Sequence, residues 1–321
     1  MEPLSLQHAG EVVRRLARVR VRFAGDAGAR PLVLPDAAFF PDRFAGDQRS
    51  VDRLARRLQR HAGLQDIPIS VSLVDANGDP VEPSGGACGT GGCGSGACGS
   101  TPAGGGVTRV LEEGDGWRVH VVESELADPV VLTVALARAL ARIFLEESRE
   151  PAETIDEPVE ATTDLAAVLL GLGVLLLEGS HVYRKGCGGP SVGKLTALGP
   201  AELACALAFE GAAAGWDLGA ARPHLSPTQR EVFDDACAVA ATNEGVAVRL
   251  ELEPAALAAS GVALAEAKSW LGRLLARRRR PRSAREALDR GASLEELEAL
   301  VAREGAAAGP AGGVAARRAR S

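Results

Sequence analysis

The sequence predicts an α+β fold in which helices dominate and a small sheet is packed by them. Apolar residues recur at helical spacing in several long segments, whereas only a few short segments alternate between apolar and polar residues. The 321 residues are 46% hydrophobic and 24% charged, which is enough apolar side chain for a sizeable core. We find no internal repeat.

The first part of the chain is expected to contribute helices and one side of the sheet. Residues 8–23 form an amphipathic, arginine-rich helix within an N-terminal segment 1–30, and "PLVLP" at 31–35 forms a short strand. A helix over 50–61 follows, with Asp47 or Ser50 available as its N-cap. Residues 67–75 alternate in polarity and predict a second strand that ends in a turn.

The central part combines a glycine-rich loop, a strand and two apolar helices. The loop spans 82–106, and alternation predicts a strand over 116–124. A helix is expected from Asp128-Pro129 to Glu147, because aspartate caps helices and proline suits their first position. An acidic connector at 148–163 leads to a buried helix over 164–178, and a second glycine-rich loop surrounds Cys187.

The C-terminal part is expected to be helical and then disordered. Helices are predicted over 200–214, 226–241 and 254–280, the last ending in the basic run 277–282, with a short helix at 293–303. We therefore divide the chain into a core at 31–215, a helical region at 216–304 and a disordered tail at 305–321.

Charge and hydropathy exclude several classes of protein. The net charge of −6 argues against a general nucleic-acid-binding protein. The longest apolar run, 165–177, is shorter than the roughly 20 residues that span a bilayer, so no membrane span is expected. The N-terminus lacks the apolar segment of a signal peptide. We therefore expect a cytoplasmic protein with reduced cysteines.

The histidines and cysteines give one candidate metal site. No two of the five histidines are spaced for a metal on one helix face. Cys88, Cys93 and Cys98 are regularly spaced in the glycine-rich loop, and Cys187 is available as a fourth thiolate for zinc or iron. This spacing matches neither CxxC knuckles nor common iron–sulfur runs, so a glycine- and serine-rich loop of low complexity is the alternative.

The helix "TVALARALARIFLEE" at 133–147 poses a different question. It is apolar on most sides, yet Arg138, Arg142 and Glu146 fall on one narrow stripe. Such a stripe faces either solvent or a polar cleft, and periodicity alone favours solvent.

The order of motifs around this helix resembles a poorly characterised group of bacterial zincin-like proteins with a metallopeptidase-type HExxH helix. The resemblance covers about residues 31–215 and rests on "LVLPDAAFFPDRFAGD", on "ELADP" before the helix, and on "VEATTDLAAVLLGLGVLL" after it. It implies a zincin-like core with a helical C-terminal extension.

The resemblance also implies that the zinc motif has been replaced. Arg138 stands at the first histidine position, Ala139 at the general-base glutamate and Arg142 at the second histidine, while Glu160 and Asp164 stand at the third-ligand position and the acid after it. Arginine cannot ligate a metal and alanine cannot act as a base. A salt bridge from Arg138 or Arg142 to Glu160 would instead replace the charge of zinc.

Three functions follow from these patterns. The first is a catalytically inactive, metallopeptidase-like pseudoenzyme that needs no cofactor and binds an unknown protein partner. The second is a metal-binding or redox protein that uses the Cys88, Cys93 and Cys98 loop. The third is an enzyme of another class that holds an anionic ligand near Arg138 and Arg142.

Overall fold

The computed structural model describes residues 4–27, 30–81, 109–149, 158–186 and 189–267. All of them belong to one compact unit, residues 1–267, and the boundaries expected after residues 30 and 215 fall inside it. Several predictions lie outside the described residues: the loop 82–106, half of the acidic connector, the basic run 277–282, the helix 293–303 and the tail 305–321.

The predicted fold class is confirmed, because helices dominate and the main sheet is small. The sheet has three strands in the order β1-β3-β2: β1 (Ile69–Val74), β3 (Gly116–Val122) and β2 (Val110–Glu113). β1 is parallel to β3, and β2 is antiparallel to it. The strands predicted at 67–75 and 116–124 are present with slightly shorter bounds, whereas β2 was not predicted.

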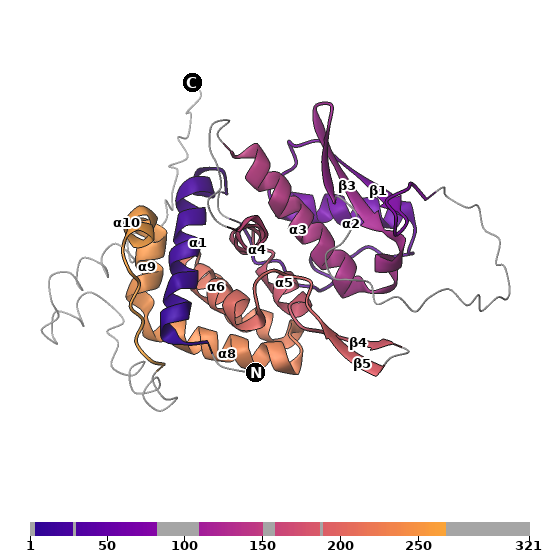
Figure 1. Ribbon diagram of the computed structural model, residues 1–321. Coiled ribbons are helices and arrows are strands. Elements are labelled where there is room, and N and C mark those ends of the chain that lie inside the picture. The colour runs from indigo at the N-terminus through magenta and orange to yellow at the C-terminus, as the bar shows by residue number, and fades with distance from the viewer. Residues whose placement is uncertain (1–3, 28–29, 82–108, 150–157, 187–188, 268–321) are drawn as a thin grey trace, which may run out of the picture. The chain divides into compact units, whose positions relative to one another are not determined.

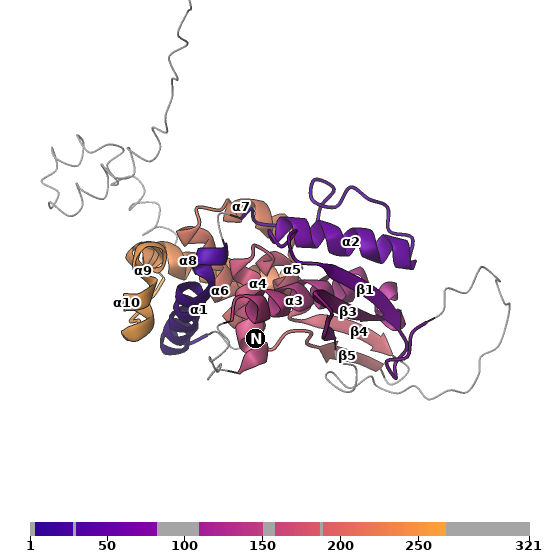
Figure 2. The same ribbon diagram turned by 90° about the horizontal axis from the view of Figure 1, so that it is seen from above.

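The helices lie mainly on one side of this sheet (Figures 1 and 2). α4 (Val159–Leu169) is central and contacts α1 (Leu6–Ala27), α3 (Pro129–Glu147), α5 (Gly173–Gly179) and α6 (Pro200–Ala213). α3 lies between α4 and the sheet and packs against β3. The remaining elements are α2 (Gln48–His61), η1 (Glu123–Ala127), α7 (Leu218–Ala221), η2 (Arg222–His224), α8 (Pro227–Thr242), α9 (Glu244–Leu252), α10 (Pro254–Ala259) and the hairpin of β4 (Val182–Gly186) and β5 (Gly189–Gly193).

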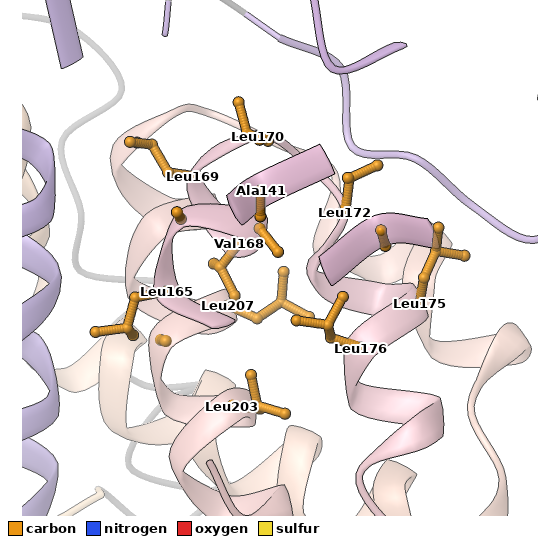
Figure 3. Close-up of a cluster of buried hydrophobic side chains, with 14 of the residues drawn as sticks. Ala141, Leu165, Val168, Leu169, Leu170, Leu172, Leu175, Leu176, Leu203 and Leu207 are labelled. Carbon is orange, nitrogen blue, oxygen red and sulfur yellow. The ribbon is translucent and has the colours of Figure 1, made fainter. Parts of the chain in front are cut away.

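The core is built mostly from aliphatic side chains of these helices (Figure 3). Leu165 and Val168 of α4, Leu176 of α5, and Leu203 and Leu207 of α6 are all fully buried. Burial of each such side chain contributes roughly 1.5–3 kcal/mol. Among the described residues, no helix is long and apolar enough to cross a membrane.

The predicted strand at 31–35 and the predicted single helix at 164–178 were both wrong, for a shared reason. The apolar helix breaks into α4 and α5 at Gly171, whose φ is +80°. Residues 31–35 form no strand; instead, the Val33 amide donates to the Gly171 carbonyl at 2.9 Å. A Cβ on Gly171 would lie 2.2 Å from the Pro31 carbonyl oxygen, so only glycine permits this approach.

The predicted helix over 254–280 was also wrong in its described part. α10 ends at Ala259, and Ser260 is extended with φ −95° and ψ 159°. The side chain of Asn243 then bonds both the amide and the carbonyl of Ala265, at 2.8 and 2.9 Å. Val262 and Leu264 pack against the core. These contacts hold the segment extended, and a helix would lose them.

Candidate functional site

A cleft of about 500 Å³ lies among α3, α4 and the β2–β3 side of the sheet. Four of the five positions that the resemblance singles out, Arg138, Ala139, Arg142 and Glu160, are on its wall, although they come from two helices. The other lining residues are Arg109, Val110, Glu112, Trp117, Glu146 and Thr163.

Arg138 connects three segments through its guanidinium. Nε donates to Oδ1 of Asp164 at 2.8 Å, and Nη2 to Oε2 of Glu160 at 2.5 Å. Nη1 donates to the Leu195 carbonyl at 3.2 Å. The expected contact between Arg138 and Glu160 is therefore present, but Glu160 is 70% exposed and Asp164 is fully buried. The buried acid that Arg138 neutralises is Asp164.

Asp164 is held on both carboxylate oxygens. Its Oδ2 accepts from the amides of Ala197 and Leu198, at 2.7 and 2.8 Å, while Oδ1 faces Arg138. Burial raises the pKa of Asp164 above its usual value, and Arg138 and the two amides act against this shift. Every partner is a donor, which matches an ionised carboxylate. The pair thus fixes α4 and the 195–198 segment to α3.

Arg142, one turn further along α3, has a partner on its own helix. Its Nη2 contacts Oε1 of Glu146 on the same helix, and it has no contact with Glu160 among those the structure gives. Oε2 of Glu146 has a second partner, Nη2 of Arg149 at 3.2 Å. The Arg142 side chain is 34% exposed. The two arginines of the stripe therefore differ, since the partners of Arg138 come from other segments and the partner given for Arg142 lies on its own helix.

The opposite wall of the cleft is the edge of the sheet. The Arg109 carbonyl accepts from the His120 amide at 2.8 Å, and the strand register pairs Val110 with Val119 and Glu112 with Trp117. Hydrogen-bonded and non-hydrogen-bonded pairs alternate in an antiparallel ladder. The peptide groups of Val110 and Glu112 therefore point away from β3. Among the described strands, β2 has no other neighbour.

Side-chain hydrogen bonds also fix the ends of this wall. Arg109 makes a two-point contact with Glu125, at 2.7 and 2.9 Å, and donates to the His120 carbonyl at 3.0 Å. Trp117 donates through Nε1 to Oε1 of Glu147 at the end of α3, at 2.5 Å. These contacts fix both ends of the strand side of the cleft.

The described lining of the cleft consists of arginine, glutamate, threonine and apolar side chains. Its described lining includes no histidine, cysteine, serine or lysine, and the Thr163 hydroxyl is already bonded to the Val159 carbonyl at 2.9 Å. Within the described part of the chain, no three His, Cys, Asp or Glu side chains are grouped to hold a metal. The candidate metal ligands Cys88, Cys93, Cys98 and Cys187 lie outside the described residues.

No protein-family model, curated protein or solved structure matches this chain. Sequence reasoning identified the helical side of the cleft and missed its strand side, Arg109, Val110, Glu112 and Trp117. A usable signal was present in Gly114-Asp115, which joins β2 to β3. Glycine at the first position of a two-residue turn is typical of a type II′ hairpin, and the φ of Gly114 is +59°.

Proposed function

We propose that this protein is a catalytically inactive, metallopeptidase-like binding module whose cleft takes an extended peptide beside β2. The observation that carries the proposal is that the outward-facing edge of β2 and the Arg138, Ala139, Arg142 and Glu160 positions border the same cleft. The first supplies a means of binding a peptide, and the second explains why the peptide is not cleaved.

Loss of hydrolysis follows from the side chains at those positions. A zinc peptidase of the type that the sequence resembles needs two histidine ligands and a carboxylate that accepts a proton from water. Arg138 offers only donors, and these are already bonded to Asp164, Glu160 and the Leu195 carbonyl. Ala139 has no proton acceptor in its side chain. Arg138 therefore cannot ligate zinc, and Ala139 cannot accept the proton from water.

Peptide binding follows from the edge of the sheet. The peptide groups of Val110 and Glu112 point away from β3 and have no partner strand among the described residues, and such groups are what strand addition uses. The four residues of β2 extend about 13 Å, a length that matches three or four residues of an added strand. The side chains of Val110 and Trp117 supply apolar surface on the same wall.

The peptide edge is tested by screening the full chain against an array of unrelated twelve-residue peptides. Val110→Pro removes the outward amide without removing a bond to β3, and Val110→Ala is its matched control, since it shortens the same side chain but keeps the amide. We expect Val110→Pro alone to abolish capture of the retained peptides. Equal capture by both variants contradicts strand addition.

The metallopeptidase-like origin of the cleft is tested by restoring the motif. The variant R138H/A139E/R142H should bind one zinc ion per chain, with Glu160 as third ligand, and adding Glu160→Gln should weaken that binding. Zinc is measured by atomic emission after dialysis. Failure of the folded triple variant to gain zinc over the wild type removes the support that the resemblance gives.

A further inference from the structure

We infer that a second pocket, separate from the cleft beside β2, binds a small uncharged apolar molecule. This pocket has a volume of about 340 Å³ and lies among the 35–44 loop, α2 and the start of α3. The described linings of the pocket and the cleft share no residue, so the inference is independent of the peptide site. It depends on the apolar walls of the pocket, the contacts of its polar side chains and the balance of its charges.

The walls of the pocket are mainly aliphatic and aromatic. Leu132 of α3 is fully buried, whereas Phe44 of the loop is 41% exposed, so part of the Phe44 side chain is still in contact with water. A ligand that covers this surface removes apolar area from water, which favours binding of an apolar compound. The other apolar lining residues are Pro35, Ala37, Phe40, Leu54 and Pro129.

The loop that forms one wall is held in place by its own contacts. Oδ1 of Asp36 accepts from the amides of Ala38 and Phe39 at 2.8 and 3.2 Å, and the Asp36 carbonyl accepts from the Phe40 amide at 2.8 Å. Nε2 of His61, at the end of α2, lies 3.2 Å from the Phe39 carbonyl oxygen. The His61 ring also packs edge-on against the rings of Phe39 and Phe40. A ligand therefore pays little entropy to order this wall.

Most polar side chains of the lining already have partners. Both Nε and Nη2 of Arg57 donate to Oδ2 of Asp42, at 2.9 and 2.7 Å. The Thr133 hydroxyl donates to the carbonyl of the first residue of α3 at 2.5 Å, and the Ser50 hydroxyl to the carbonyl of the α2 N-cap at 2.9 Å. A polar ligand would have to replace these contacts and so would gain little from them.

The formal charges of the lining cancel. Asp36 and Asp42 supply two negative charges, and Arg43 and Arg57 supply two positive charges. Arg43 is exposed, so its guanidinium is solvated without a ligand. A charged ligand would lose hydration on entering the apolar part of the pocket and would find no net opposite charge there. The lining therefore favours a neutral ligand.

The volume of the pocket limits the size of the ligand. About 340 Å³ lies near the lower end of the range for small-molecule sites. An apolar cavity of about 150 Å³ holds one benzene molecule, so this pocket suits a compound of roughly a dozen non-hydrogen atoms. The ligand class is thus a neutral aromatic or aliphatic compound of that size.

The test uses 4-phenylphenol, a neutral compound of this size, with biphenyl-4-carboxylate and 4-phenylbenzylamine as its anionic and cationic counterparts. Binding to the full chain is measured by calorimetry at neutral pH. We expect the phenol to bind at least about tenfold more tightly than either charged compound. Leu54→Trp, which fills the pocket from α2, should abolish binding. Leu252→Trp, the same change at a residue 71% exposed and outside the lining, should preserve it.

Two further variants place the ligand. Phe44→Ala should weaken binding of the phenol at least about fivefold, because it removes apolar contact area, whereas Val110→Pro should leave binding unchanged. Equal or tighter binding of a charged compound overturns the neutral class of ligand. Unchanged binding in a folded Leu54→Trp protein, or loss of binding in Val110→Pro, overturns the assignment to this pocket. Absence of phenol binding overturns the inference and leaves the peptide site standing.

Discussion

Replacement of Arg138 by methionine should be far more costly than the same change at Arg142, one turn away. Methionine keeps much of the aliphatic stem but removes the donors to Asp164, Glu160 and the Leu195 carbonyl. Asp164, which is fully buried, would then keep only the amides of Ala197 and Leu198. An uncompensated buried charge is among the few causes of large destabilisation.

The magnitude follows from comparing the two arginines. Loss of one partner from a buried pair costs about 3–5 kcal/mol, and the lower figure applies here because Arg138 is 23% exposed and two amides remain. Arg142 and Glu146 form a partly exposed i,i+4 pair, with side chains 34% and 14% exposed, and Arg149 stays beside Glu146, so Arg142→Met should cost less than about 1 kcal/mol.

The destabilisation caused by Arg138→Met should also depend on pH. Burial raises the native pKa of Asp164 above its unfolded value, so the native state binds more protons between these two pKa values. The free energy of unfolding therefore falls as pH rises through this window. Removing Arg138, which opposes the shift, widens the window. The loss in free energy of unfolding caused by Arg138→Met should therefore be smallest at acidic pH and reach its full value at neutral pH.

The assay is urea denaturation followed by circular dichroism, at about pH 4 and pH 7, on both methionine variants and on Asp164→Asn alone and combined with Arg138→Met. The double-mutant cycle should give a coupling of about 2 kcal/mol or more at neutral pH and less in acid. Equal losses for Arg138→Met and Arg142→Met, or a coupling near zero, refute the view that Arg138 neutralises Asp164.

Three further predictions use the same measurement. Gly171→Ala should lower the free energy of unfolding by about 2–4 kcal/mol, because φ is +80° and the new Cβ would lie 2.2 Å from the Pro31 oxygen. Gly215→Ala, with φ +71° and open space around it, should cost only about 1 kcal/mol. Equal costs would contradict the close approach at Gly171. Glu210 is buried against Arg20, and burial raises the pKa of Glu210. As pH rises above about 4, the free energy of unfolding of the wild type should therefore fall relative to that of Glu210→Gln. Parallel pH profiles of the two proteins would contradict this. Leu165→Ala should cost about 2–5 kcal/mol, and Leu252→Ala, at 71% exposure, less than about 0.5 kcal/mol; a small loss at Leu165 would argue against close packing of the core.

The sequence predicted those helix starts that depend on local chemistry. The Asp128 side chain accepts from Val130 and Val131 at the start of α3, and Asp47 accepts from Ser50 at the start of α2. Each signal acts within a few residues, so it needs no tertiary structure. The strands at 69–74 and 116–122 were equally visible, since both alternate in polarity, and β3 buries Val119 and Val121 on one face.

The elements that the sequence did not predict depend on contacts between segments that are distant in the chain. The apolar run 165–177 has no polar interruption, and its break at Gly171 is fixed by Pro31 and Val33, far away in sequence. β2 has four residues, two of them glutamates, and gains its order from β3. Residues 110–113 do not alternate in polarity, so the local signal for β2 was limited to the Gly114-Asp115 turn that joins it to β3.

Arg138 and Arg142 lie on the same stripe of α3, so helical periodicity cannot distinguish them, although they should differ in their contribution to stability. Arg138 and Arg142 have the same chemistry and neighbouring positions on one face, yet the partners of the first come from α4 and the 195–198 segment, while the partner of the second comes from α3 itself. An arginine that satisfies a buried carboxylate is costly to move, because moving it exposes that charge to a medium that cannot solvate it. An arginine that shares its acid with a neighbouring cation leaves that acid partnered when it is removed. The residue with the larger effect on stability should therefore be Arg138.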